Sequence, residues 1–200
     1  ETINELTAFF QESDDDNILE IILSVLLISN KKSFDENKLL LYETFLKEQL
    51  NISERRKNKL GIATASYNLG NYHRSKGNYL ESLKFYLKAR KFNSDYKSQS
   101  YYYYELAGVL FLLNKFNFAS KFYSKSLELN TDYHLAKALL ADSLMYSGNY
   151  LEAQNKIDEF LNEQKNLQDN DEWLLKYSCL KTLIEIGHPT SQIRDENLAI

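Results

Sequence analysis

Three segments of this 200-residue chain carry the same order of apolar, small and turn-forming residues. Each segment begins with a large apolar residue followed directly by a small one, and a turn-forming residue comes seven positions after the small one. A second small residue then follows, with another large residue four positions after it. The matching positions are Leu69-Gly70, Gly77, Ser82 and Tyr86 in the first segment, Leu106-Ala107, Asn114, Ala119 and Tyr123 in the second, and Leu140-Ala141, Gly148, Ala153 and Ile157 in the third. The second and third segments are 34 residues apart, and the first and second are 37 apart. A period of this length predicts an array of helix pairs.

The residue types predict how the two helices of each pair meet. Small residues let the helix axes approach closely, and the large residues one turn later fill the remaining space. Gly77, Asn114 and Gly148 are expected in the turns, because Gly and then Asn adopt positive φ most easily. Six Gly and one Pro are too few for the turns of a many-stranded sheet protein. We therefore expect an all-α fold with antiparallel helix pairs over 63–92, 100–129 and 133–163.

The first segment resembles the tetratricopeptide repeat family in its string Tyr67-Asn68-Leu69-Gly70-Asn71, followed by Gly77-Asn78-Tyr79 and Ala89. The resemblance covers about half of the chain, from residue 63 to about residue 164. It implies a helix-pair solenoid wound into a right-handed superhelix. The chain departs from the family pattern where Ser66, Tyr103 and Lys137 replace a common Trp, and where Ser94 and Thr131 replace a common Pro.

The flanking sequences are interpreted as weaker continuations of the same array. We expect a single continuous domain with a degenerate helical repeat or N-terminal cap at 1–52, three repeats at 53–167, and a capping or incomplete fourth repeat at 168–200. A capping box at Ser33-Phe34-Asp35-Glu36 predicts a helix that pairs with another at 18–28, and an apolar stripe predicts a further helix at 173–184. Because 53–76 contains no Pro, we expect the first helix of the first repeat to extend back to about Ser53. The chain begins with Glu1 instead of Met, which we interpret as the sign of a fragment.

The charge and composition exclude several classes of function. A formal net charge of −4 argues against nucleic-acid binding, which depends on clustered cations. The one basic run, Arg55 to Lys59, is interpreted as a solvated helix face. With one Cys, three scattered His and no phosphate-binding Gly motif, we predict no catalytic residues, no metal and no cofactor. The single Cys, and the lack of a signal-peptide pattern or membrane span, predict a cytoplasmic location.

In tetratricopeptide arrays the first helices line a concave face that commonly binds partners, so the resemblance implies a candidate binding surface here. It would be aromatic and apolar, with a few polar anchors. Its candidate residues are Tyr67, Asn71, Arg74, Tyr101, Tyr104, Phe111, Asp142 and Met145. Two alternatives stay open: the tyrosines at 101–104 fill a step created by the three-residue insertion, or a flanking helix of the chain occupies the groove.

Some members of the family bind the acidic C-terminus of heat-shock chaperones with a clamp of Lys and Asn. Asn71 matches one clamp position, but Tyr67 replaces its Lys, Glu105 replaces the next Asn, and Leu135 and Leu139 replace the last two. We therefore predict a non-catalytic scaffold that binds a protein or peptide other than a chaperone tail, with self-association left open. The alternative function is that of a sensor or regulatory domain in a larger signalling protein, an NTPase or a transcription regulator, whose activity is encoded elsewhere.

Overall fold

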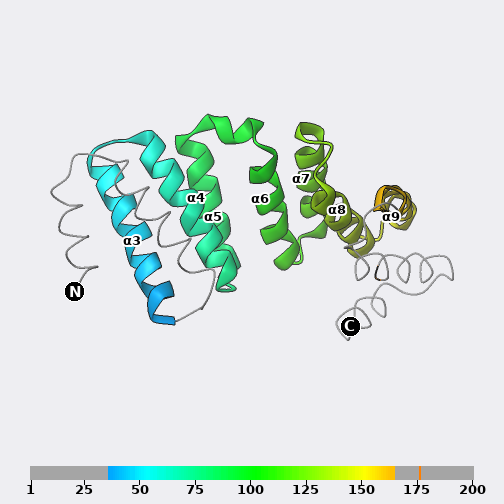
Figure 1. Cartoon of the computed structure of the whole chain (residues 1–200), viewed down its shortest axis with the longest axis horizontal. Helices are drawn as coiled ribbons and strands as arrows, with labels where there is room; N and C mark the ends of the chain where they lie inside the picture. The colour runs from blue at the N-terminus through cyan, green and yellow to red at the C-terminus, as the bar shows by residue number, and fades with distance from the viewer. Residues whose placement is uncertain (1–35, 165–175, 177–200) are drawn as a thin grey trace. The chain divides into compact units, whose positions relative to one another are not determined.

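The computed structural model describes residues 36–164 and Lys176. Within that part the chain forms α-helices and one short 3₁₀ helix, and it contains no strand. The elements are α3 (Glu36–Arg55), α4 (Lys59–Ser75), α5 (Tyr79–Phe92), η2 (Ser94–Ser98), α6 (Ser100–Leu112), α7 (Phe116–Leu129), α8 (His134–Tyr146) and α9 (Tyr150–Gln164) (Figure 1). The three predicted helix pairs are α4–α5, α6–α7 and α8–α9, which confirms the all-α prediction. The helices expected at 18–28 and 173–184 lie outside the described residues.

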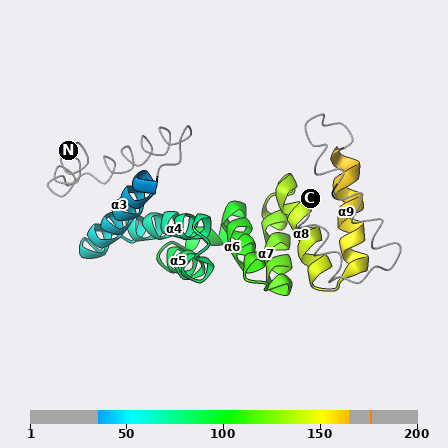
Figure 2. The ribbon, with the colours of Figure 1, turned by 90° about the horizontal axis from the view of Figure 1, so that it is seen from below.

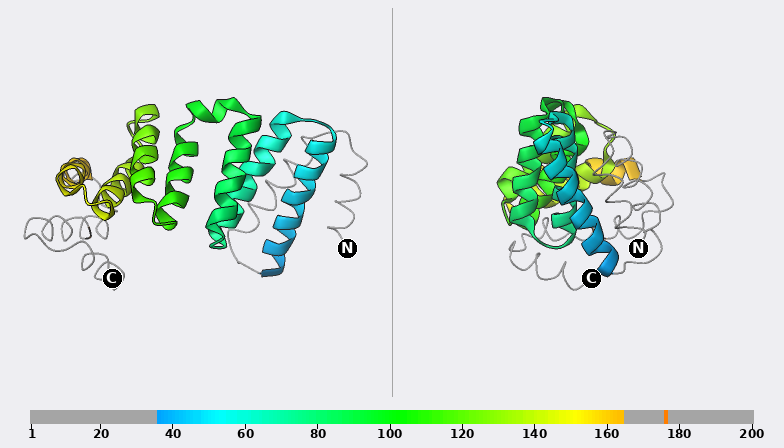
Figure 3. Two further views of the ribbon diagram at one scale, coloured as in Figure 1. Left: turned by 180° about the vertical axis from the view of Figure 1, so that it is seen from behind. Right: turned by 90° about the vertical axis from the view of Figure 1, so that its left-hand side faces the viewer.

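The chain divides into two compact units, Glu1–Tyr96 and Lys97–Ile200. In the first, α4 packs against both α3 and α5, and Figures 1 and 2 show the three helices as neighbours. In the second, each helix packs against the next one along the chain, from α6 to α9 (Figure 3). Each unit is therefore a stack of antiparallel helices with its own core. The expected division of the chain at residues 53 and 168 stays a prediction.

The turn within each helix pair has the left-handed residue that the sequence predicts. Gly77, Asn114 and Gly148 have φ of 77°, 57° and 84°. In all three turns the residue after the left-handed one donates its backbone N–H to the carbonyl five residues earlier in the chain. In the first turn this is the hydrogen bond of 2.8 Å from Asn78 to His73. This closing bond satisfies a carbonyl that the helix end would otherwise leave unpaired. The predicted positive φ is confirmed at all three positions.

A fourth turn of the same kind, between α3 and α4, corrects one prediction. The first helix of the first repeat does not extend back to Ser53, because α3 ends at Arg55 and Lys57 has φ 54°. The backbone N–H of Asn58 donates to the carbonyl of Ser53 at 2.9 Å, and its side chain caps α4 by accepting from Gly61 N–H at 3.0 Å. The basic run from Arg55 to Lys59 therefore crosses a turn instead of covering one helix face.

The helix crossings follow the predicted pattern of small and large residues. Gly70 lies against Tyr86, and a Cβ added at Gly70 would come within 2.6 Å of the Tyr86 ring. Ser82 Oγ donates to the carbonyl of Gly70 at 2.7 Å, so the two helices also share a hydrogen bond. The equivalent residues of the second unit are fully or almost fully buried: Ala107, Ala119, Tyr123, Ala141, Ala153 and Ile157. The alignment of the three segments therefore describes the packing correctly.

Candidate partner-binding surface

Tyr67 of α4 is held between two other tyrosines in the first unit. Its ring lies 5.4 Å from that of Tyr96, stacked at an interplanar angle of 18°, and 5.5 Å from that of Tyr86, tilted at 46°. Tyr96 lies on η2 and is 8% exposed, while Tyr67 is half-buried. The Tyr67 ring is therefore fixed by neighbours from α5 and from the connector that follows it.

The second unit repeats this arrangement with the same residue types. Tyr104 of α6 stacks on Tyr133 with ring centroids 4.6 Å apart, and it meets Tyr123 edge to face at 5.8 Å. Each of these tyrosines stands 37 residues after its counterpart in the first unit. We call the sets Tyr67, Tyr86, Tyr96 and Tyr104, Tyr123, Tyr133 the two tyrosine triplets. Sequence reasoning included Tyr67 and Tyr104 in the candidate surface but missed Tyr96 and Tyr133, although the spacing of 37 residues was available to find them.

The polar candidates of the first unit are partly engaged within the protein. Asn71 accepts a hydrogen bond from the hydroxyl of Tyr86 through its side-chain carbonyl. Arg74 is half-buried on the next turn of α4, the same turn as His73. Burial lowers the pKa of His73, although Glu43 on α3 opposes that change. The ring of His73 stacks on Phe85 of α5 at 5.2 Å, so this end of α4 is closely packed against its neighbours.

The remaining candidates on α6 differ in how much surface they present. Tyr101 is 43% exposed and stands one turn before Tyr104 on the same helix. Phe111 is half-buried, with its ring 5.2 Å from Phe116 and 5.5 Å from Tyr146. Tyr101 is thus the most accessible aromatic candidate of the second unit.

The two candidates on α8 have almost no accessible surface. Met145 is 1% exposed and Asp142 is 6% exposed. Asp142 accepts a charge-assisted hydrogen bond from Lys176 Nζ at 2.9 Å, and Lys176 comes from the chain beyond α9. The ammonium group of Lys176 therefore lies against Asp142. Asp142 and Met145 are therefore not part of the accessible surface. The candidate residues with accessible surface are those on α4 and α6.

Within residues 36–164 and Lys176, no group of three or more His, Cys, Asp or Glu side chains is arranged to hold a metal ion. None of the described helices is both long enough and apolar enough to cross a membrane.

Comparison with known proteins identifies the class of fold. Neither a protein-family model nor a curated protein sequence matches the chain. One similar solved structure contains the nearly identical TPR-like repeats of a putative kinesin light chain from Podosopora anserina. It aligns with a TM-score of 0.68 at 10% identity, and the alignment covers 94% of this chain and 92% of that one. YrrB, described as a TPR protein with an unusual peptide-binding site, aligns with a TM-score of 0.62 at 20% identity, covering 88% and 84%.

A third match is to the Thermobaculum terrenum O-GlcNAc transferase, with a TM-score of 0.60 and 21% identity. It covers 76% of this chain but only 27% of the transferase chain, so the likeness is to one part of that enzyme. Together these matches show that the chain has the fold of the tetratricopeptide repeat proteins, an all-α array of helix pairs. At these identities the likeness is one of fold.

Proposed function

We propose that this chain is a non-catalytic module that binds a protein or peptide on the first helices of its repeats. The observation that carries the proposal is the recurrence of the tyrosine triplets, which hold Tyr67 on α4 and Tyr104 on α6 at the same repeat position. Both rings are half-buried and packed on two neighbours, so little side-chain entropy is left to lose when a partner binds.

Each unit presents groups of the kind that contact peptides. In the second unit Tyr101 supplies an exposed ring beside Tyr104, and in the first unit Asn71 and Arg74 supply polar groups on α4. Aromatic side chains contribute a large contact area, and the polar groups orient the backbone or side chains of a bound peptide. Such a surface favours a peptide with apolar anchors over one recognised chiefly by charge. A reducing, cytoplasmic location, inferred from the single Cys, is part of this proposal.

A chaperone acidic tail does not fit this proposal. A clamp for a terminal carboxylate needs cations on successive first helices, and Tyr67 takes the place of the first Lys. That position is filled by the Tyr67 ring, which packs between Tyr86 and Tyr96 and carries no cationic group. We expect synthetic peptides ending in a chaperone-like acidic sequence to bind no better than scrambled peptides of the same charge.

The proposal is tested by selecting peptides from a displayed random library on the whole chain and measuring their affinity by calorimetry. We expect Tyr101→Ser to weaken the selected peptides about tenfold or more, because it removes an exposed ring from the contact. Phe118→Ser, on α7 and 57% exposed, is the matched control at a surface outside the first helices. Selected peptides that bind Tyr101→Ser and Arg74→Gln as tightly as the unchanged chain would contradict a first-helix binding surface.

A further inference from the structure

The outer face of α5 carries an exposed stripe of leucine and lysine. Leu80 is 64% exposed and Leu87 is 44% exposed, and both stand on the same side of the helix, two turns apart. Lys84 lies between them with 71% of its side chain exposed, and Lys91 follows one turn after Leu87. We call Leu80, Lys84, Leu87 and Lys91 the α5 stripe. The two leucines give this face of α5 an apolar surface flanked by lysines.

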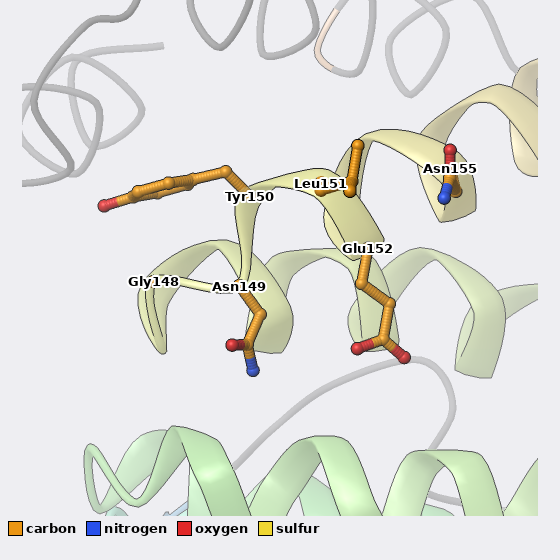
Figure 4. A pocket seen from close by; sticks show the side chains of 6 residues that line it. All are labelled: Gly148, Asn149, Tyr150, Leu151, Glu152 and Asn155. Carbon is orange, nitrogen blue, oxygen red and sulfur yellow. The ribbon is translucent and has the colours of Figure 1, made fainter.

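The corresponding face of α9 carries a stripe with the opposite charge. The pentapeptide Gly148-Asn149-Tyr150-Leu151-Glu152 repeats the sequence of residues 77–81 without a change, and Leu151 is 76% exposed. Figure 4 shows Leu151 and Asn155 on one side of the first two turns of α9, beside an open cavity of about 460 Å³. Asn155, Asp158 and Glu159 stand at the repeat positions of Lys84, Leu87 and Lys88. We call Leu151, Asn155, Asp158 and Glu159 the α9 stripe.

The two helices have opposite net charges of equal size. Helix α5 contains Lys84, Lys88, Arg90 and Lys91 against the single acid Glu81, a formal charge of +3. Helix α9 contains the acids Glu152, Asp158, Glu159 and Glu163 against the single base Lys156, a formal charge of −3. The intrahelical ion pairs Lys84–Glu81 and Lys156–Glu159 are exposed i,i+3 pairs. Pairs of this kind contribute little stability, so their charges are available to exchange partners.

We propose that the α5 stripe of one copy of this chain docks on the α9 stripe of a second copy. Each stripe supplies an exposed leucine, so the contact removes apolar surface from water, and each supplies the charges that the other lacks. Because both stripes are on every copy, a second copy always carries a matching surface. The proposal does not rest on the first-helix binding surface, since the stripes lie on second helices.

The size of the stripes sets the strength of the contact. A stripe of about three helical turns buries less than the roughly 1,200–2,000 Å² of total area typical of stable complexes. The association is therefore weak, and it depends on salt because the lysines and carboxylates are at the surface. The contact joins two different surfaces, so it is heterologous.

The test is sedimentation equilibrium of the whole chain between about 20 and 500 µM, at 50 mM and at 500 mM salt, where screening is several times shorter in range. We expect the weight-average mass to rise with concentration at low salt and to stay monomeric at high salt. Lys84→Glu combined with Lys91→Glu should abolish the rise, as should Asp158→Lys combined with Glu159→Lys. When the two double variants are mixed in equal amounts, association should return. One variant then carries acidic stripes and the other carries basic stripes, so each finds a stripe of the opposite charge.

The controls separate this contact from general charge and folding effects. Lys115→Glu with Lys121→Glu changes the net charge by the same amount on α7 and should leave association intact, since both residues are exposed outside the stripes. Leu80→Ser with Leu87→Ser leaves the charge unchanged and should still abolish association. Thermal melting by circular dichroism checks that every variant is folded. A chain that stays monomeric at 500 µM and low salt, association that survives the α5 variants, or folded double variants that do not associate when mixed would each overturn the proposal.

Discussion

Gly70→Ala is the substitution that tests the helix crossing of the first repeat most directly. The added Cβ would lie 2.6 Å from both Cδ1 and Cε1 of Tyr86, and 3.2 Å from its Cγ. The whole ring must move, because the contacts include the ring atom nearest the backbone. Tyr86 is fully buried, its ring packs on Tyr67, and its hydroxyl donates to Asn71, so a shift disturbs several contacts at once.

The magnitude follows from three contributions to the free energy of unfolding. Overpacking a core site costs about 1–3 kcal/mol. A strained or lost hydrogen bond from Tyr86 to Asn71 costs about 0.5–1.5 kcal/mol more. Replacing Gly by Ala inside a helix returns up to about 1 kcal/mol. We therefore expect a net destabilisation of about 1–3 kcal/mol, measured by urea unfolding followed by circular dichroism at 222 nm.

A second background identifies the ring as the cause. In the third repeat the equivalent residues are Ala141 and Ile157, both buried, so an Ala faces a smaller side chain there. In a chain that already carries Tyr86→Ile, we expect Gly70→Ala to be neutral or stabilising. Ala107→Gly, at the same repeat position in the second unit, should destabilise by about 1 kcal/mol through helix propensity and lost packing. A stabilising effect of Gly70→Ala in the unchanged chain would refute the packing argument.

Two further predictions concern the first unit. Lys57→Gly should stabilise the chain by about 0.5–1 kcal/mol in urea unfolding, because Lys57 has φ 54° and Gly adopts this region without a steric penalty. The opposite change, Gly77→Ala at φ 77°, should destabilise the chain by about 1 kcal/mol. Because burial lowers the pKa of His73 below its ordinary 6.5, the unfolded chain binds the proton more readily, and stability should fall as the pH drops through 6.5. Replacing His73 by Phe should remove that part of the pH dependence between pH 7.5 and 5.5, whereas changing the exposed His134 to Gln should retain it.

The helix pairs were predictable because their signals are local and repeated. Gly77 and Gly148 mark turns by residue type alone, and Asn114 does so through its tolerance of positive φ. Lys57 takes the same backbone conformation without any such signal, since nothing distinguishes it from the other bases in its run. Residue type therefore does not identify the turn at Lys57. It is identified in the structure by its hydrogen bond from Asn58 to Ser53, which has the same pattern as in the other three turns.

The candidate surface was only partly predictable, because exposure depends on contacts between distant parts of the chain. The sequence places Asp142 at the repeat position of Asn71, and both were expected to face a partner. In the structure the side-chain carbonyl of Asn71 also accepts a hydrogen bond from Tyr86 on the neighbouring helix, and Asp142 binds Lys176, which is 34 residues away. Helical periodicity fixes which face a residue occupies, but it carries no information about which later segment covers that face.

The tyrosine triplets explain why the three repeats contribute differently to the surface. In the first two repeats the first-helix tyrosine is held by one tyrosine from the second helix and one from the connector that follows. The three-residue insertion lies between these repeats, yet all three tyrosines keep a spacing of 37, so it shifts the triplet as a whole. In the third repeat Ala138 and Ile157 replace the first two members, and both are fully buried. The first-helix tyrosines of the proposed peptide contact are therefore on α4 and α6, while the exposed charges of α5 and α9 lie on second helices. Substitutions on one set of helices should consequently change peptide binding or self-association separately.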